Sequence, residues 1–251
     1  MDAEDTTDMY INAFIDSKEK QQTDLHFRCQ TGVGSFNWRM LFPVDLPRKD
    51  KNNYLNIQVF DKDFFSPDDY ICSNNINLED FLNRIYDLDT PIKFSENYWK
   101  SMTDNEKEKM FQTKDKEYFP EWCHDDENVE NKFWLHMKEK NKEGQFIKSG
   151  AVLISLEAMP QWKADICKVG LGRDEPNCNP WLPPPFGRFE WSLNPWKIFK
   201  QCVGPKMRTK ICTIILVIFC LIWLIFMIPY IVNYLGGEII NPFNWKKIIS
   251  G

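Results

Sequence analysis

The sequence predicts an all-β domain, an antiparallel β-sandwich, followed by one transmembrane helix. Short stretches rich in β-branched and aromatic residues recur between residues 9 and 93, with polar turns between them. A further alternating stretch covers residues 151–159, and an uncharged, almost wholly apolar run covers residues 211–232. A chain of 251 residues has room for one sizeable domain and accessory segments.

Four of the stretches predict the first strands of the sandwich. They are residues 9–15, 23–29, 36–42 and 53–60, and Gly32 and Gly34 indicate a tight turn between the second and the third. Residues 133–140 and 151–159 predict two late strands. Regular short strands with turn signals are typical of a sandwich, so residues 1–169 are assigned to this domain.

Two segments depart from the strand pattern. Residues 94–131 are charged with sparse apolar positions, which predicts a polar, partly helical and solvated insertion. Residues 170–210 predict an extended, proline- and aromatic-rich linker that ends in a basic juxtamembrane segment, since residues 170–205 hold seven of the 15 prolines. The aromatic side chains of this linker favour the headgroup zone of a membrane. They are Trp181, Phe186, Phe189, Trp191, Trp196 and Phe199.

The run at residues 211–232 has the length and composition of a membrane span. A helix of 22 residues is about 33 Å long, and the hydrocarbon core of a bilayer is about 30 Å thick. Five basic residues precede the span, whereas Lys246 and Lys247 follow it in the short tail 233–251. The positive-inside rule then places the N-terminal part in the cytosol and the tail in the lumen or outside. The preceding basic residues are Lys197, Lys200, Lys206, Arg208 and Lys210.

Charge and motifs exclude two classes of function. The net charge of −5 and the pI of about 5.4 give no indication of nucleic-acid binding. Ser35 is not followed by the second glycine of a nucleophile elbow. Cys123, His124 and His136 match no zinc-ligand spacing. The sequence therefore predicts no catalytic residue and no enzyme.

An acidic stretch, "VFDKDFFSPDDY", follows the strand at residues 53–60. Asp61, Asp63, Asp68 and Asp69 are crowded there around Phe64. Carboxylates gathered at a loop tip suit calcium, which takes six to eight oxygen ligands and relieves the repulsion between the acids. A solvated acidic turn that binds nothing is the alternative.

The spacing of Asp61, Asp63 and Asp69 resembles the calcium loop of the C2 domain, a β-sandwich whose apical loops gather calcium. This resemblance implies two more ligands in an earlier loop, Asp2 and Asp8, and a hydroxyl ligand at Ser66. It also implies that Phe64 and Phe65 lie at the outer tip of the loop. There they would enter the bilayer once calcium has neutralised the acids.

Several stretches are similar to the C-terminal part of the ferlin family, nearest its dysferlin and myoferlin branch. They are "TDLHFRCQTGVGSFNWRMLFPVD", the acidic loop, "GLGRDEPNCNP" and "FEWSLNPWK", followed in order by the span. The resemblance implies an integral membrane protein of vesicles or the plasma membrane. It also implies binding of calcium, anionic phospholipid and fusion-machinery proteins in vesicle fusion or membrane repair.

The chain departs from the family pattern at its start. It begins at the first calcium loop, so the sandwich is expected to lack its first strand, which would weaken calcium binding. A calcium-independent C2-like scaffold that binds partners or lipid is therefore the alternative function.

Overall fold

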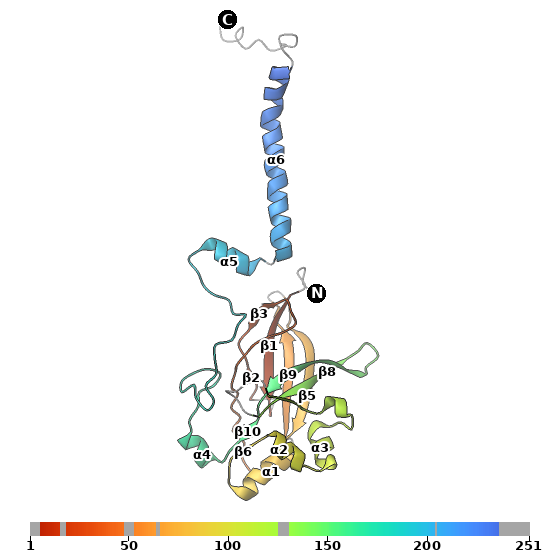
Figure 1. Cartoon of the computed structure of the whole chain (residues 1–251), viewed down its shortest axis with the longest axis vertical. Coiled ribbons are helices and arrows are strands. Elements are labelled where there is room, and N and C mark those ends of the chain that lie inside the picture. Colours follow the sequence, from red (N-terminus) through yellow and green to blue (C-terminus); the bar gives the residue numbers. More distant parts are fainter. Residues whose placement is uncertain are drawn as a thin grey trace. The chain divides into compact units, whose positions relative to one another are not determined.

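The computed structural model describes residues 6–15, 19–47, 53–63, 66–124, 131–203 and 205–235. The chain divides into two compact units, Met1–Phe189 and Glu190–Gly251. The first holds all the strands of the described residues, and the second holds two helices (Figure 1).

The first unit is built on an antiparallel sheet of eight strands (Figure 1). The path through the sheet is β2-β1-β4-β5-β8-β7, with β3 also paired to β1 and β9 to β8. A second, two-stranded sheet joins β6 to β10. The predicted antiparallel all-β class is therefore confirmed. The strands are β1 (Thr7–Phe14), β2 (Gln21–Gln22), β3 (His26–Cys29), β4 (Tyr54–Asp61), β5 (Asp69–Asn77), β6 (Ile92–Lys93), β7 (Glu121–Cys123), β8 (Lys132–Lys140), β9 (Phe146–Ile154) and β10 (Glu157–Ala158).

Alternating side chains of the central strands form the core. On β4, Leu55, Ile57 and Val59 are buried, and on β8, Phe133, Leu135 and Met137 are buried. This period of two is the reason the sequence pattern predicted both strands.

The stretch 36–42 is not a strand, which corrects the prediction. Its backbone makes one bridge, between Arg39 and Gly172. The Arg39 guanidinium donates to the carbonyl oxygens of Gly170, Cys178 and Pro180, at 3.1, 2.8 and 2.6 Å. This extended segment therefore contacts residues 170–180, near the C-terminal end of the first unit, and does not join the sheet.

Four helices belong to the first unit, in addition to a short 3-10 turn (Lys116–Tyr118). Three of them gather at the end of the sheet opposite the start of β1 (Figure 1). The prediction missed the first helix, whereas a partly helical insertion is confirmed. The helices are α1 (Glu79–Leu88), α2 (Glu96–Ser101), α3 (Asp104–Phe111) and α4 (Gln161–Ile166).

The charge pattern predicted a solvated insertion, and this is wrong in part, because the insertion contributes side chains to the core. Phe94 and Phe111 are 0% exposed. The Phe94 ring lies 5.0 Å from that of Phe133 on β8 and 5.6 Å from that of Trp122 on β7. A few large rings suffice to bury this segment, so its many charges misled the interpretation.

Residues 170–189 are extended, and they pack along the first unit; we refer to them as the strap. Arg188 donates to Asp24, with Nε–Oδ2 at 2.9 Å and Nη2–Oδ1 at 2.5 Å, and Arg173 also donates to Asp24. Burial alone would raise the pKa of Asp24, but the hydrogen bonds from both arginines hold it below its usual value. Backbone bonds add to these contacts, including Phe27 N to Gly187 O at 2.7 Å.

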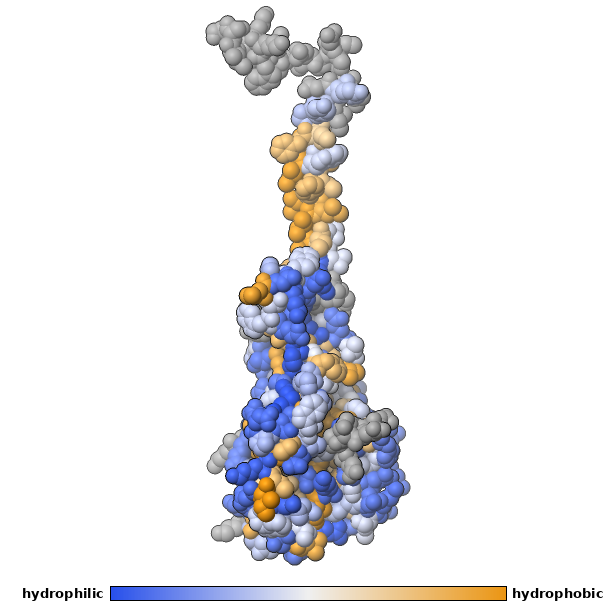
Figure 2. Space-filling view, turned by 60° about the vertical axis from the view of Figure 1, so that its left-hand side comes forward, coloured by the Kyte–Doolittle hydropathy of each residue, from blue (hydrophilic) through white to orange (hydrophobic). Residues whose placement is uncertain are grey.

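The second unit contains α5 (Pro195–Cys202) and α6 (Pro205–Leu235). Residues Met207–Tyr230 of α6 have a mean hydropathy of 3.2, and among the described residues this is the one helix long and apolar enough to cross a membrane. Figure 2 shows its apolar surface. A span of 24 residues is about 36 Å long. The predicted span at 211–232 lies within α6.

Candidate metal site at the acidic end of the sheet

Three neighbouring strands bring most of the predicted acidic ligands to one end of the sheet. Met9 of β1 pairs with Asp61 at the end of β4, and Asp61 in turn pairs with Asp69 at the start of β5. Asp8 precedes Met9 on β1. The strand register therefore places Asp8, Asp61 and Asp69 next to one another, although they are far apart in the sequence.

Backbone amides hold two of these carboxylates. Asp8 N donates to Asp61 Oδ1 at 2.6 Å, and Arg28 N donates to Asp8 Oδ1 at 2.6 Å. Lys62 N donates to the carbonyl oxygen of Asp8 at 2.8 Å. These bonds tie the start of β1 to the loop that follows β4, so the two halves of the predicted site are directly connected.

The loop itself is organised by hydrogen bonds among its own side chains. Ser66 Oγ donates to Asp63 Oδ2 at 2.7 Å, so the predicted hydroxyl ligand lies beside a predicted carboxylate ligand. Asp63 N lies 3.4 Å from Asp68 Oδ1, to which it donates. The structure thus brings together Asp63 and Ser66, two of the residues that the spacing in the sequence pointed to.

Asp68 has a different role from its neighbours, one that the sequence did not reveal. Its Oδ2 accepts a hydrogen bond from the Tyr10 hydroxyl at 2.6 Å and forms an ion pair with Lys62 Nζ at 3.0 Å. The Tyr10 hydrogen bond, followed by that of Lys62, lowers the pKa of Asp68. Burial, then the bond to Asp68, raises the pKa of Tyr10 to about 12. Asp68 therefore joins β1 to the loop.

The donor set of Asp8, Asp61, Asp63, Asp69 and Ser66 consists of oxygens only, which fits calcium in chemical type. Asp2, Phe64 and Phe65 lie outside the described residues. Within the described ranges, no three His, Cys, Asp or Glu side chains are grouped closely enough to hold a metal ion.

The predicted basic residues lie on the two helices of the second unit. Lys197 pairs with Glu190 at 2.8 Å, and this hydrogen bond lowers the pKa of Glu190. Lys200 lies in the last turn of α5, and Arg208 and Lys210 lie in the first turns of α6. The backbone of Lys206 is in α6, whereas its side chain is outside the description.

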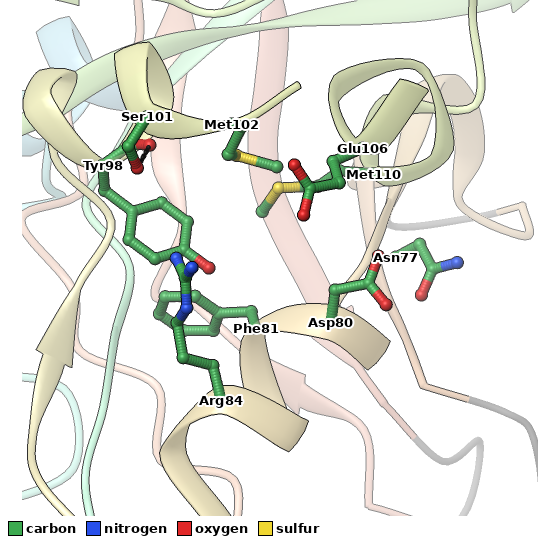
Figure 3. A pocket seen from close by; sticks show the side chains of 9 residues that line it. All are labelled: Asn77, Asp80, Phe81, Arg84, Tyr98, Ser101, Met102, Glu106 and Met110. Atoms are coloured by element: carbon green, nitrogen blue, oxygen red, sulfur yellow. Dashed lines mark hydrogen bonds between the residues drawn. The ribbon is translucent and has the colours of Figure 1, made fainter. Parts of the chain in front are cut away.

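A small pocket lies between α1 and the α2–α3 segment (Figure 3). The Arg84 guanidinium lies 5.2 Å from the centroid of the Tyr98 ring, and Met102 and Met110 line the opposite side. Asn77, at the far end of β5 from Asp69, also lines it. A strand of nine residues is about 30 Å long, so this pocket is separate from the acidic loop.

Comparison with known proteins defines the class. The C2 domain family matches residues 1–94, the part of the chain that contains the acidic loop. The chain is thus a C2-domain protein with one candidate membrane-spanning helix.

Curated relatives narrow this class to a family. Myoferlin of Mus musculus is 30% identical over 265 residues, which cover 95% of this chain and 12% of the relative. The myoferlins of Xenopus tropicalis and Homo sapiens are 28% and 29% identical over the same share of the chain. The chain belongs to the ferlin family, and it spans 12–13% of the length of these relatives. No solved structure matches it.

Proposed function

We propose that this chain is a membrane-anchored C2 module that binds calcium through its acidic loops and then binds anionic phospholipid, to promote vesicle fusion or membrane repair. The observation that carries the proposal is the convergence of Asp8, Asp61 and Asp69 at one end of three paired strands. The ferlin relatives and the apolar helix α6 support the membrane setting.

Calcium would be held by Asp8, Asp61, Asp63 and Asp69, with Ser66 and Asp2 as further oxygen donors. When bound, the ion supplies positive charge that offsets the crowded carboxylates. The hydrogen bonds from backbone amides to Asp8 and Asp61 keep these two side chains in place before the ion arrives. The protein's contribution is thus pre-organisation of acids that would otherwise repel one another.

The lipid-binding step follows from the change in charge. Without calcium, the acidic loop repels anionic headgroups, and with calcium this repulsion is removed. Phe64 and Phe65 would then insert between the lipids, each contributing about 1.5–3 kcal/mol if fully buried. A domain tethered to the membrane by its own helix needs only weak binding, because its effective concentration at a nearby surface is high.

Calcium titration of the full chain tests the first step. The chain is placed in phosphatidylcholine nanodiscs, which keep α6 in a bilayer and offer no anionic headgroup. Isothermal calorimetry is expected to show saturable calcium binding for the wild type and none for Asp61→Asn/Asp63→Asn. Absence of binding by the wild type would refute the proposal.

A calcium-independent scaffold is the second candidate, and the loop geometry favours it in one respect. Asp8 and Asp61 each already accept a backbone hydrogen bond, and Asp63 accepts one from Ser66. A loop satisfied in this way needs no ion to keep its conformation. If the wild type binds phosphatidylserine vesicles equally with and without calcium, the scaffold is the function.

A further inference from the structure

The residues just before the membrane span form a small folded unit, not a loose linker. The Gln201 side chain accepts from Glu190 N at 2.8 Å and donates to Glu190 O at 2.9 Å, which closes residues 190–201 into a loop. Lys197 Nζ adds an ion pair with Glu190 at 2.8 Å. We refer to residues 190–202 as the juxtamembrane loop-helix.

The helical part of this unit has a defined start. Asn194 Oδ1 caps α5 by accepting from Trp196 N at 2.9 Å, and Pro195 occupies the first turn. Asn194 N in turn donates to Ser192 Oγ at 3.2 Å. Capping and proline at this position both favour a helix that begins here, so the unit holds its side chains in fixed directions.

Three large apolar side chains of this unit are turned to the outside. Trp191 is 86% exposed, Leu193 105% and Trp196 57%. The Trp196 ring stacks on that of Phe199, with centroids 5.3 Å apart and planes at 18°. Exposed apolar side chains on an ordered unit mark an interaction surface.

Chain length limits where this surface can lie. Cys202, the end of α5, and Met207, the first residue of the candidate membrane span, are five positions apart. Even a fully extended chain covers only about 17 Å over five residues. Because the hydrocarbon core begins with the span, α5 must lie within this short distance of the headgroup layer.

The charges of the unit match the same location. Lys197 and Lys200 are exposed, and Glu190 is the only acidic residue between positions 190 and 237. Its charge is already paired with Lys197. Tryptophan and lysine together are the residue types that anchor a helix at an anionic membrane surface.

We propose that the juxtamembrane loop-helix lies in the interfacial layer of the bilayer that α6 enters. Trp191, Leu193 and Trp196 face the acyl boundary, and the lysines face anionic headgroups. The anchor does not depend on calcium, and it starts at Glu190, directly after the first compact unit. The sequence predicted six interfacial aromatic residues. The structure assigns Phe186 and Phe189 to ring contacts with His26 and Phe27 of the first unit, so the anchor is smaller than predicted.

Quenching of tryptophan fluorescence by brominated lipid tests this location. The full chain is placed in phosphatidylcholine/phosphatidylserine nanodiscs, with and without bromine on the acyl chains, in a calcium chelator. Trp191→Phe/Trp196→Phe is compared with Trp162→Phe/Trp134→Phe, a pair that is 49% and 38% exposed in the first unit. Subtracting the emission spectrum of each variant from that of the wild type gives the emission of the two tryptophans that the variant lacks.

The emission of Trp191 and Trp196 is expected to fall at least twofold in brominated nanodiscs, whereas that of the control pair stays unchanged. Unquenched emission from Trp191 and Trp196, as when a second copy of the chain covers them, would overturn the proposal. Equal quenching of both pairs would overturn it too, since the surface would then not be specific to this unit. The chelator keeps the result independent of calcium binding by the acidic loop.

Discussion

Neighbouring aspartates in the acidic loop have distinct roles that follow from their contacts. Asp68 is held by Tyr10 and Lys62, whereas Asp61 accepts the backbone N–H of Asp8. The sequence prediction chose Asp61, Asp63 and Asp69 as ligands, and left out Asp68, because their spacing resembles that of the C2 calcium loop. In the structure, Asp68 differs from its neighbours because it accepts a hydrogen bond from Tyr10, which lies 58 residues away in the sequence.

Asp8→Asn is expected to remove calcium binding without loss of the fold. Asparagine keeps a carbonyl oxygen that can accept from Arg28 N, whereas the negative charge is lost. In chelator, the thermal midpoint should equal or exceed that of the wild type, because repulsion with Asp61 is relieved. Under the proposed function, calcium at 100 times its dissociation constant should stabilise the wild type by about 2.7 kcal/mol.

The measurement is thermal unfolding of the first unit within the full chain in nanodiscs, with chelator and with calcium. The Asp8 variant should lose more than half of the calcium-dependent rise, and Asp87→Asn on α1, far from the loop, should keep it. A full rise in the Asp8 variant would show that Asp8 is no ligand.

Among the elements, the helical insertion depends on one ring. Phe94 is 0% exposed and contacts aromatic rings from α1, α2, α3, β7 and β8. Phe94→Ala should therefore destabilise the first unit by about 3–5 kcal/mol. Phe146→Ala on β9, where the ring is 61% exposed, is the matched control and should cost less than about 1 kcal/mol. Similar losses in the two variants, measured by thermal unfolding, would mean that the insertion is not part of the core.

The strap depends on close contact at Gly187. This residue has a φ of +75°, and a Cβ atom there would lie 2.3 Å from the buried His26 ring. Gly187→Ala should therefore release the strap and expose residues 170–189 to protease. Gly144→Ala has a similar φ of +80° with nothing within 4 Å, so it should cost only about 1–2 kcal/mol of backbone strain.

Limited proteolysis of both variants separates clash from strain. Faster cleavage between residues 170 and 189 is expected for the Gly187 variant alone. Equal cleavage rates in the two variants would contradict the claim that close contact between Gly187 and His26 holds the strap.

Alternation in the sequence was sufficient to predict β4 and β8, because their buried apolar residues follow a period of two. In β1, by contrast, four consecutive residues are buried, and β9 has no buried residue. Alternation failed for residues 36–42, which alternate but bind the strap through Arg39. Helix α1 was missed although Leu78, Phe81, Leu82 and Ile85 follow a helical period and are buried.

The strap could not be predicted, because its contacts depend on tertiary structure. Arg173 and Arg188 reach Asp24 across 149 and 164 residues, and nothing in the local pattern connects them. The calcium site stays a prediction, and it was based on the spacing of Asp61, Asp63 and Asp69, which resembles that of the C2 domain. The placement of the two aspartates Asp61 and Asp69 beside Asp8 comes from the sheet register.

At the scale of the whole molecule, the apolar helix separates a large N-terminal part from a short tail. The five basic residues before the span predict that the N-terminal part is cytosolic. In sealed microsomes, added protease should digest the first unit and leave a short fragment that contains α6. Protection of the first unit until detergent is added would contradict this orientation.

Calcium-dependent capture of a second membrane tests the proposed function most directly. The full chain in phosphatidylcholine nanodiscs is mixed with phosphatidylserine liposomes, and the liposomes are sedimented with calcium or with chelator. The wild type and Asp87→Asn/Asp104→Asn, a control on α1 and α3, should pellet only with calcium, whereas Asp61→Asn/Asp63→Asn should stay in solution. Equal pelleting of all three proteins with calcium and with chelator would contradict the calcium-dependent function and establish the scaffold. Failure of the wild type to pellet in either condition would contradict the calcium-dependent function too.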